Sequence, residues 1–415
     1  MRDASAVIPD FTGYQKFVVA VLAFLQFTVI LDFMIMAPLG AIMMPALKIS
    51  ASHFGFVVSV YAFSAGTAGL LTAGFADRFD RKKLLLFFYS GFVLGTLLCG
   101  LATSYEFLLF ARVVTGLFGG VIGSISFAIA TDLFSMEKRG RVIGLMQTAF
   151  AASQILGLPA GLYLSNHFDW HAPFFMIVGL SLIVGVLIFA YLKPIDGHLK
   201  LKSDRSPFRH LLSTLENRRY LFAFGATALL SIGGFMMMPF GSAFTVNNMG
   251  IPVENLPLIY GVTGLCSIVI GPLVGRAADR FGKFQVFVFG STVSIIMVVI
   301  YTHMGLTSLP IVILVNAVMF VGIFSRMIPS QALMSGIPDP ASRGAFMSVS
   351  SSLQQIAGGF ASILAGSIVV QTSSGLLEHF DTLGFVMVGT SIVSLVMMFF
   401  IDRMLKRPYP AQPVR

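Results

Sequence analysis

Three ionisable residues lie inside long apolar runs of this sequence. Asp32 stands in "ILDFMIMAPLG", Arg112 in "LLFARVVTGLFGG" and Arg326 in "FSRMIPSQ". By the segment assignment given below, the other acidic residues fall in tails, loops or segment ends. A charge at the centre of a membrane helix costs about 2.5 to 3.5 kcal/mol, and desolvation disfavours its charged form. Asp32 is therefore a candidate proton carrier, and a structural ion pair with Arg112 is the alternative.

Each arginine has a candidate partner. Arg112 lies about six residues inside its run and Asp32 about ten, which is roughly 9 and 15 Å at 1.5 Å per residue. Long side chains could close that difference, and a permanent cation nearby would favour the ionised acid. Arg326, about seventeen residues into its run, could bind an anionic group of a substrate or extend its head group towards the cytoplasm.

Polar and soft side chains supply further candidates for a substrate cavity. At 100° per residue Thr28, Asp32 and Met36 share one helix face, which we assign to a central cavity. Amides could bind a substrate and methionines could form an adaptable wall, although packing between helices or against lipid is the commoner role of both. The cavity candidates are Thr28, Met36, Gln154, Met237, Asn316, Arg326 and Gln354.

Composition places these residues in a membrane. The 415 residues are 56% hydrophobic and only 11% charged, whereas a soluble domain has about 25% charged residues. Apolar stretches of about 20 residues can cross a hydrocarbon core of roughly 30 Å as helices, and none has the alternation of a barrel strand. We therefore expect an all-α membrane protein with twelve transmembrane helices. They span 17–42, 54–76, 83–103, 106–131, 141–165, 172–192, 219–247, 256–278, 284–303, 309–335, 345–370 and 380–403.

Basic residues predict the orientation. With both termini on one side, 24 of the 27 lysines and arginines fall on that side, which the positive-inside rule makes the cytoplasm. We expect a multi-pass protein of the cell membrane, whose net charge of +9 reflects topology and anionic lipid and not nucleic acid. The first segment is long enough to span and lacks a small-residue cleavage site, so no cleavable signal is expected.

Enzymatic and metal sites find no support in the sequence. The histidines fall in loops or at segment ends, and neither an H-E-x-x-H metal motif nor a phosphate-binding P-loop occurs. Cys99 and Cys266 fall in predicted spans of opposite halves, so no disulfide framework is expected. We expect no enzyme activity, no cofactor and no metal.

The chain divides into two similar halves. The longest polar segment predicts a linker at 193–218 between an N-terminal six-helix bundle at 1–192 and a C-terminal one at 219–405, followed by a cytoplasmic tail at 406–415. "MAPLG" at 36–40 recurs as "MMPFG" at 237–241, and "ADRF" at 76–79 recurs at 278–281. This register indicates a parallel internal duplication, which places a substrate near the midplane between halves that rock against each other.

Several motifs resemble those of the major facilitator superfamily. "GFADRFDRKKLLL" and "GRAADRFGK" are similar to its loop signature, G-x-x-x-D-R-x-G-R-K, although the first copy has Ala73 and Asp80 where glycines belong. "LLFARVVTGLFGG" resembles the family's arginine motif, with Arg112 and Gly116 in place, and "ILGLPAG" partly matches the glycine-proline motif of its antiporters. With Asp32, these features resemble the twelve-helix drug:proton antiporter branch, which includes sugar and nucleoside exporters. The resemblance associates Arg112 with proton coupling.

The loop signatures predict a cytoplasmic gate. The resemblance places Asp77 against the start of the eleventh helix, where the helix dipole favours a carboxylate. Positive-inside anchoring is the alternative and explains the lysines, but not Asp77. The gate candidates are Asp77, Arg78, Arg81, Asp132, Asp279 and Arg280.

The sequence thus predicts a secondary active transporter that exports small amphipathic compounds in exchange for protons by alternating access. The alternative is a proton-coupled importer or exchanger of sugars, nucleosides or organic anions. We expect its partners to be the small-molecule substrate, protons and membrane lipid, and we expect a monomer.

Overall fold

A computed structural model describes residues 11–73, 75–200, 214–339 and 342–406. The first half contains α1 (Gly13–Leu47), α2 (Ala51–Ala73), α3 (Arg81–Gly100), α4 (Tyr105–Leu133), α5 (Met136–Ala152), α6 (Leu158–His167) and α7 (Ala172–Tyr191). The second half contains α9 (Arg218–Phe235), α10 (Gly241–Asn247), α11 (Leu256–Phe281), α12 (Lys283–Thr302), α13 (Leu309–Met334), α14 (Arg343–Ile368) and α15 (Phe380–Lys406). The short strands β1 (Val370–Gln371) and β2 (Leu377–Glu378) form one antiparallel pair before α15. Of the predicted linker, residues 201–213 lie outside the described residues.

The prediction of an all-helical membrane protein is confirmed. Ten segments of the described chain are helices that are long and apolar enough to cross a membrane. The other two predicted spans are also helical, but 219–247 is broken into α9 and α10, and α14 is rich in glycine and serine. The small hairpin of β1 and β2 was not predicted.

Two of the predicted spans contain irregular turns next to prolines. Between α5 and α6, Ser153–Gly157 form a π-helical turn in which the Leu158 N–H donates to the carbonyl oxygen of Ser153. The following Pro159 has no N–H to donate, which removes one regular helical bond at this point. Pro239 lies in the break between α9 and α10. These turns interrupt helices that pack at the junction between the two halves.

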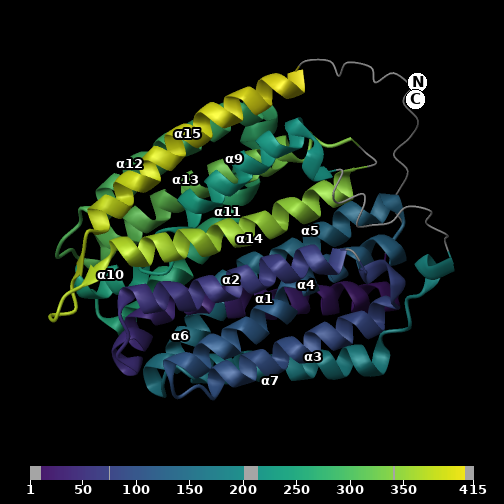
Figure 1. Cartoon of the computed structure of the whole chain (residues 1–415), viewed down its shortest axis with the longest axis horizontal. Coiled ribbons are helices and arrows are strands. Elements are labelled where there is room, and N and C mark those ends of the chain that lie inside the picture. The colour runs from purple at the N-terminus through teal and green to yellow at the C-terminus, as the bar shows by residue number, and fades with distance from the viewer. Residues whose placement is uncertain (1–10, 74, 201–213, 340–341, 407–415) are drawn as a thin grey trace.

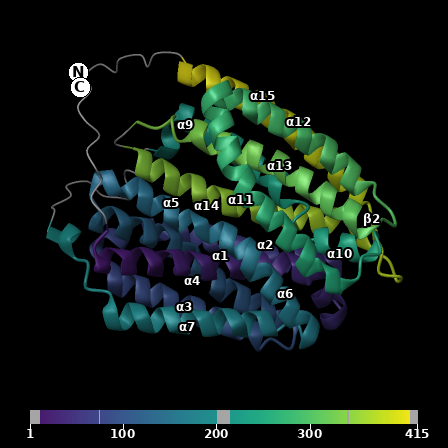
Figure 2. The ribbon, with the colours of Figure 1, turned by 180° about the vertical axis from the view of Figure 1, so that it is seen from behind.

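The two halves lie side by side, with α1 to α7 on one side and most of α9 to α15 on the other (Figures 1 and 2). The longest junction joins α2 to α14, and it depends on small residues. A Cβ at Gly55 would lie 2.6 Å from the carbonyl oxygen of Ser362, and the Ser59 hydroxyl donates to the carbonyl oxygen of Gly359 at 2.9 Å. The α2 and α14 backbones can therefore approach closely along this line.

We call the end where α1 begins and α15 ends the terminal end, and the opposite end the distal end. One large apolar cluster extends along the first half, and at the distal end it includes residues of both halves, such as Phe54 and Phe240, whose ring centroids are 6.3 Å apart. Towards the terminal end two smaller clusters belong to the second half, and Leu70 and Phe150 are the first-half residues that pack against them. The helices of the two halves diverge in that direction (Figure 1).

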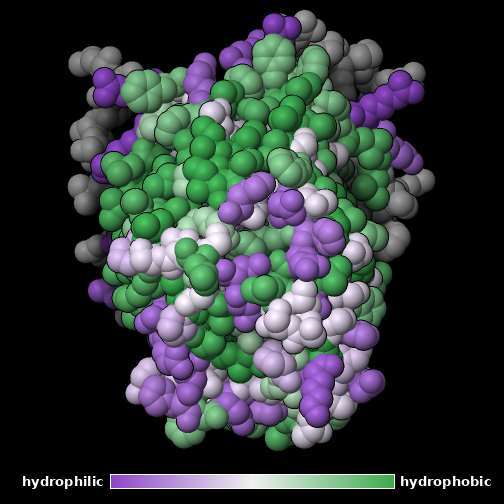
Figure 3. Space-filling view, turned by 90° about the vertical axis from the view of Figure 1, so that its left-hand side faces the viewer, coloured by the Kyte–Doolittle hydropathy of each residue, from purple (hydrophilic) through white to green (hydrophobic). Residues whose placement is uncertain are grey.

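The distal end is closed by direct contacts between the halves. The Ser242 hydroxyl donates to the carbonyl oxygen of Ala37 at 2.9 Å, and a Cβ at Gly40 would lie 3.1 Å from the carbonyl oxygen of Pro239. Figure 3 looks at this end and shows hydrophilic residues gathered at its centre and lower part, with hydrophobic surface above them. The structure therefore represents a distally closed state.

Candidate functional site

Asp32 and Arg112 form a buried ion pair within the first half. Nη1 of Arg112 donates to Oδ2 of Asp32 at 2.8 Å, and the two side chains are 1% and 0% exposed. The alternative that Asp32 neutralises Arg112 is thus realised in this state, although a role in proton transfer is still compatible with it. Among the described residues, Asp32 is the only fully buried carboxylate.

Side chains from two more helices complete this site. The Thr96 hydroxyl of α3 donates to Oδ1 of Asp32 at 3.1 Å. The guanidinium carbon of Arg112 lies 4.3 Å from the centre of the Tyr61 ring on α2, which allows a cation–π interaction. Asp32 belongs to α1 and Arg112 to α4, so the site joins all four helices. A change of charge on Asp32 would act on their packing directly.

The ion pair is incompletely satisfied. Nε of Arg112 is buried and has no hydrogen-bond partner. An arginine that only locked two helices would gain more from a bidentate fork that uses two of its N–H groups. The single bond to Asp32 leaves a donor available for a second arrangement of the pair.

The face of α1 that we assigned to a cavity is buried in this state. Thr28 and Met36 are fully buried, and the Thr28 hydroxyl donates to the Leu25 carbonyl oxygen at 3.0 Å and lies 3.2 Å from the Tyr89 hydroxyl of α3. Thr28 therefore packs against α3 inside the first half in this state. That this face lines a central cavity stays a prediction.

The remaining cavity candidates are dispersed. Gln154 lies in the π-helical turn and its Oε1 is buried without a partner, while Asn316 donates to the Val312 carbonyl oxygen of its own helix at 2.9 Å. Met237 belongs to the apolar cluster at the distal end, and Gln354 is half-buried on α14. Gln154 touches the junction, since a Cβ at Gly264 of α11 would lie 3.0 Å from its carbonyl carbon. These residues do not form one described pocket, and their roles stay predictions.

Arg326 is half-buried on α13. Its Nε is enclosed without a hydrogen-bond partner, and within the described residues no carboxylate pairs with it. Anion binding and extension to the membrane surface both stay predictions for this residue.

Two of the gate candidates form a pair inside the first half. Nε of Arg81 donates to Oδ2 of Asp132 at 3.1 Å, which joins α3 to α4 at the terminal end. Arg78 is exposed, and so are Asp279 and Arg280 at the end of α11. The side chain of Asp77 lies outside the described part of the structure. A set of contacts between these residues that holds the two halves together at the terminal end, here called the latch, stays a prediction for the distally open state.

Sequence reasoning missed Thr96, Tyr61 and the residues that close the distal end. Thr96 lies in an apolar run and carries no signal of its own until α3 is placed against α1. The distal contacts were partly signalled, because the repeated motifs at 36–40 and 237–241 turn out to face each other there. An internal repeat at the ends of equivalent helices could have indicated that junction.

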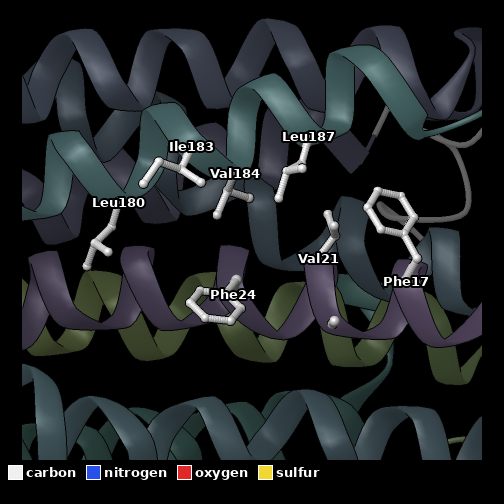
Figure 4. Close-up of a pocket in the computed structure, with 8 residues that line it drawn as sticks. Phe17, Val21, Phe24, Leu180, Ile183, Val184 and Leu187 are labelled. Carbon is white, nitrogen blue, oxygen red and sulfur yellow. The ribbon is translucent and has the colours of Figure 1, made fainter.

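One pocket in the described structure lies away from every candidate residue. An apolar groove of about 200 Å³ runs between α1 and α7, where Phe17, Val21 and Phe24 face Leu180, Ile183, Val184 and Leu187 (Figure 4). Phe24 is 52% and Ile183 62% exposed. An exposed apolar groove on membrane helices matches a surface that contacts acyl chains. Within the described residues no cluster of three or more metal-ligating side chains occurs.

The chain is similar to known transporters along most of its length. It is 26% identical over 364 residues to an uncharacterized MFS-type transporter, YceJ of Bacillus subtilis. The aligned region covers 86% of this chain and 88% of that protein. It is also 26% identical over 251 residues to the multidrug resistance protein MdtG of Salmonella typhimurium, covering 59% and 61% of the two chains.

Solved structures share the fold. A bacterial homologue of the human lysosomal transporter Spinster, in an inward-facing and unoccupied conformation, superposes with a TM-score of 0.76 at 16% identity over 97% of this chain and all of that one. The nucleoside transporter NupG gives a TM-score of 0.74 at 16% identity, over 93% of this chain and 99% of its own. A model of the Major Facilitator Superfamily matches residues 22–362. The chain therefore belongs to the major facilitator superfamily of transporters.

Proposed function

We propose that this transporter exports small amphipathic compounds in exchange for protons. The observation that carries the proposal is the carboxylate of Asp32, which is completely buried beside a single cation. A buried acid in a membrane helix is expected to be functional, because an apolar residue would fill its place at lower cost. The similarity to a multidrug resistance protein supports export of such compounds.

The pair suggests how a proton would act. When Asp32 is ionised it holds Arg112, and when it binds a proton it loses most of that attraction. The guanidinium stays charged, so it must then find other partners near Tyr61 and Thr96. Binding or release of one proton would thereby change the contacts among four helices of the first half.

Alternating access would link this event to the substrate. In our proposal the terminal end faces the cytoplasm, both termini are cytoplasmic, and the distally closed state is open inwards. The divergence of the halves at the terminal end and the excess of basic residues there support this orientation. Asp77, with the pair of Arg81 and Asp132, would hold the halves together when the distal end opens. We propose a monomer in the cell membrane.

Transport in proteoliposomes with an imposed pH gradient tests this function. A mixed panel of amphipathic drugs, sugars and nucleosides identifies the substrate class. We expect a proton gradient to drive uphill movement of amphipathic compounds, with a matching proton flux in the opposite direction. Gradient-driven movement of sugars, nucleosides or organic anions in the same direction as protons would favour the alternative, an importer.

A variant of similar volume tests Asp32 as the proton carrier. Asp32→Asn keeps nearly the same volume but removes the titratable proton. We expect uphill transport to be lost while exchange of substrate across the membrane without a gradient persists. Uphill, pH-driven transport at the parent rate in this variant would reject Asp32 as the proton carrier.

A further inference from the structure

The interior of the second half contains a polar layer between two apolar clusters. One cluster lies towards the terminal end and includes Phe287 and Leu333, and the other lies towards the distal end and includes Met297 and Val315. Four polar residues lie between them along their helices: Thr227 on α9, Ser291 and Ser294 on α12, and Arg326 on α13.

Three of these residues share one depth in the bundle. Thr227 is nine residues from the start of α9, Ser291 is eight from the start of α12, and Arg326 is eight from the end of α13. At 1.5 Å per residue, each lies roughly 12 to 14 Å from the terminal end of its helix. Helices of one bundle that cross the same membrane therefore bring these three side chains to one level.

The helix faces also agree. Ser291 lies four residues from Phe287, and Arg326 lies seven residues from Leu333, so each shares the face of a residue in the interior cluster. A Cβ at Gly322, one turn before Arg326, would lie 2.6 Å from Oγ of Ser294. Helical side chains lean towards the N-terminus of their helix, which for Arg326 is towards this turn and away from the terminal end. Extension of Arg326 to the membrane surface is therefore disfavoured.

Each of these four residues has one buried donor atom without a hydrogen-bond partner among the described residues. The hydroxyls of Thr227, Ser291 and Ser294 and Nε of Arg326 are buried and unpartnered. Serines and threonines in membrane helices ordinarily donate to a carbonyl one turn back, as Ser231 does to Thr227 at 2.9 Å. Within the described part of the second half no carboxylate is buried.

In contrast to the first half, this polar layer has, among the described residues, no negative charge to balance its arginine. There Arg112 has its counter-charge in Asp32, whereas the second half has Gly233 at the position equivalent to Asp32. We propose that the polar layer binds a small monovalent anion, such as chloride, between Arg326 and the hydroxyls of α9 and α12. An anion accepts from every donor here and needs no donor of its own. The close contact of α12 with α13 at Gly322 favours an ion over an organic acid.

Thermal unfolding of the purified full-length protein in detergent tests this site. Chloride replaces gluconate at constant ionic strength, and the unfolding temperature is followed as a function of chloride concentration. We expect a saturable rise in the parent, because a ligand that binds only the folded state stabilises it. Arg326→Gln should weaken the apparent affinity at least about tenfold, since it removes the charged donor. Arg276→Gln removes an exposed arginine of the same half and should leave the affinity unchanged.

A second variant keeps the charge and guards against misfolding. Replacing both Ser291 and Ser294 by alanine should weaken chloride binding by roughly 2- to 10-fold for each hydroxyl that donates. Absence of a saturable chloride effect in the parent, as for a layer filled by water, would overturn the proposal. An effect that persists unchanged in the Arg326 and serine variants would overturn it too. These readouts need no transport, so the site stands or fails independently of the proposed export.

Discussion

A pair of substitutions at Asp32 and Arg112 would separate the two roles of the ion pair. Asp32→Asn leaves the guanidinium of Arg112 buried at 1% exposure with no counter-charge. Removing one partner of a buried pair typically costs about 3 to 5 kcal/mol. Arg112→Gln should cost less, because an aspartic acid can bind a proton and become neutral, whereas a guanidinium stays charged. The double variant removes both charges and should recover most of the lost stability.

Equilibrium unfolding of the four proteins in mixed micelles measures this cycle. We expect a coupling energy of a few kcal/mol, which corresponds to more than a hundredfold change in the unfolding equilibrium. Additive losses in the double variant would mean that the bond of 2.8 Å contributes no net stability, and the reasoning from burial would fail.

Transport by the same four proteins then tests the function. The double variant should be stable but unable to couple substrate movement to a pH gradient, because its interior has no titratable acid at this site. A stable double variant with normal uphill transport would leave the pair a structural role only.

Three further outcomes follow from the geometry. Arg112→Lys should impair coupling, because an ammonium cannot keep the contact with Asp32 and the stacking on the neighbouring ring together; normal proton-driven transport would contradict this. Gly55→Val should separate α2 from α14, because even a Cβ would lie 2.6 Å from the Ser362 carbonyl oxygen. In the same micelle assay it should lower the free energy of unfolding by about 1 to 3 kcal/mol. An unchanged free energy of unfolding would show that the two helices can move apart without cost. Asp77→Asn should shift the equilibrium between the distally open and distally closed states towards the closed one, by roughly 5- to 150-fold. Spin-label distances between the terminal ends of the two halves measure this shift. Unchanged distances would mean that Asp77 does not hold the halves together.

The helices and the charge pair could be predicted because both follow from strong local signals. Long apolar runs marked the transmembrane helices, and the structure places their ends within a few residues. Asp32 and Arg112 stood out because charges in such runs are costly, and their neutralisation of each other was one of two alternatives left open. Their estimated depths in the membrane differed, but the two side chains are long enough to form the ion pair.

The surroundings of the pair could not be predicted. Periodicity grouped Thr28 with Asp32 on one face but gave no direction for that face, which depends on how α1 rotates against α3 and α4. Thr96 and Tyr61 contact the pair from helices that are distant in sequence. Their parts depend on helix packing, which one sequence does not encode in any local pattern.

Asp80 illustrates a departure from a motif that the structure explains. In the loop signature a glycine belongs at this position, but the Asp80 carboxylate caps α3 by accepting from the Lys83 N–H at 2.9 Å. Its other oxygen accepts from the Ile195 N–H at 2.8 Å and fixes the segment that follows α7. A carboxylate with these local bonds has little freedom to share a latch with Asp77 across the halves.

The predicted internal duplication would account for both the symmetric and the asymmetric features of this transporter. Equivalent motifs at 36–40 and 237–241 meet at the distal end, as expected when two copies of one bundle face each other about a shared axis. The interior charges do not follow that symmetry, because the position equivalent to Asp32 is Gly233, which packs on Thr390 so closely that a Cβ there would lie 2.8 Å from its hydroxyl. A side chain at position 233 would have to displace the Thr390 hydroxyl. In our proposal the proton binds at Asp32 in the first half, and the junctions between the halves transmit its effect to the second half.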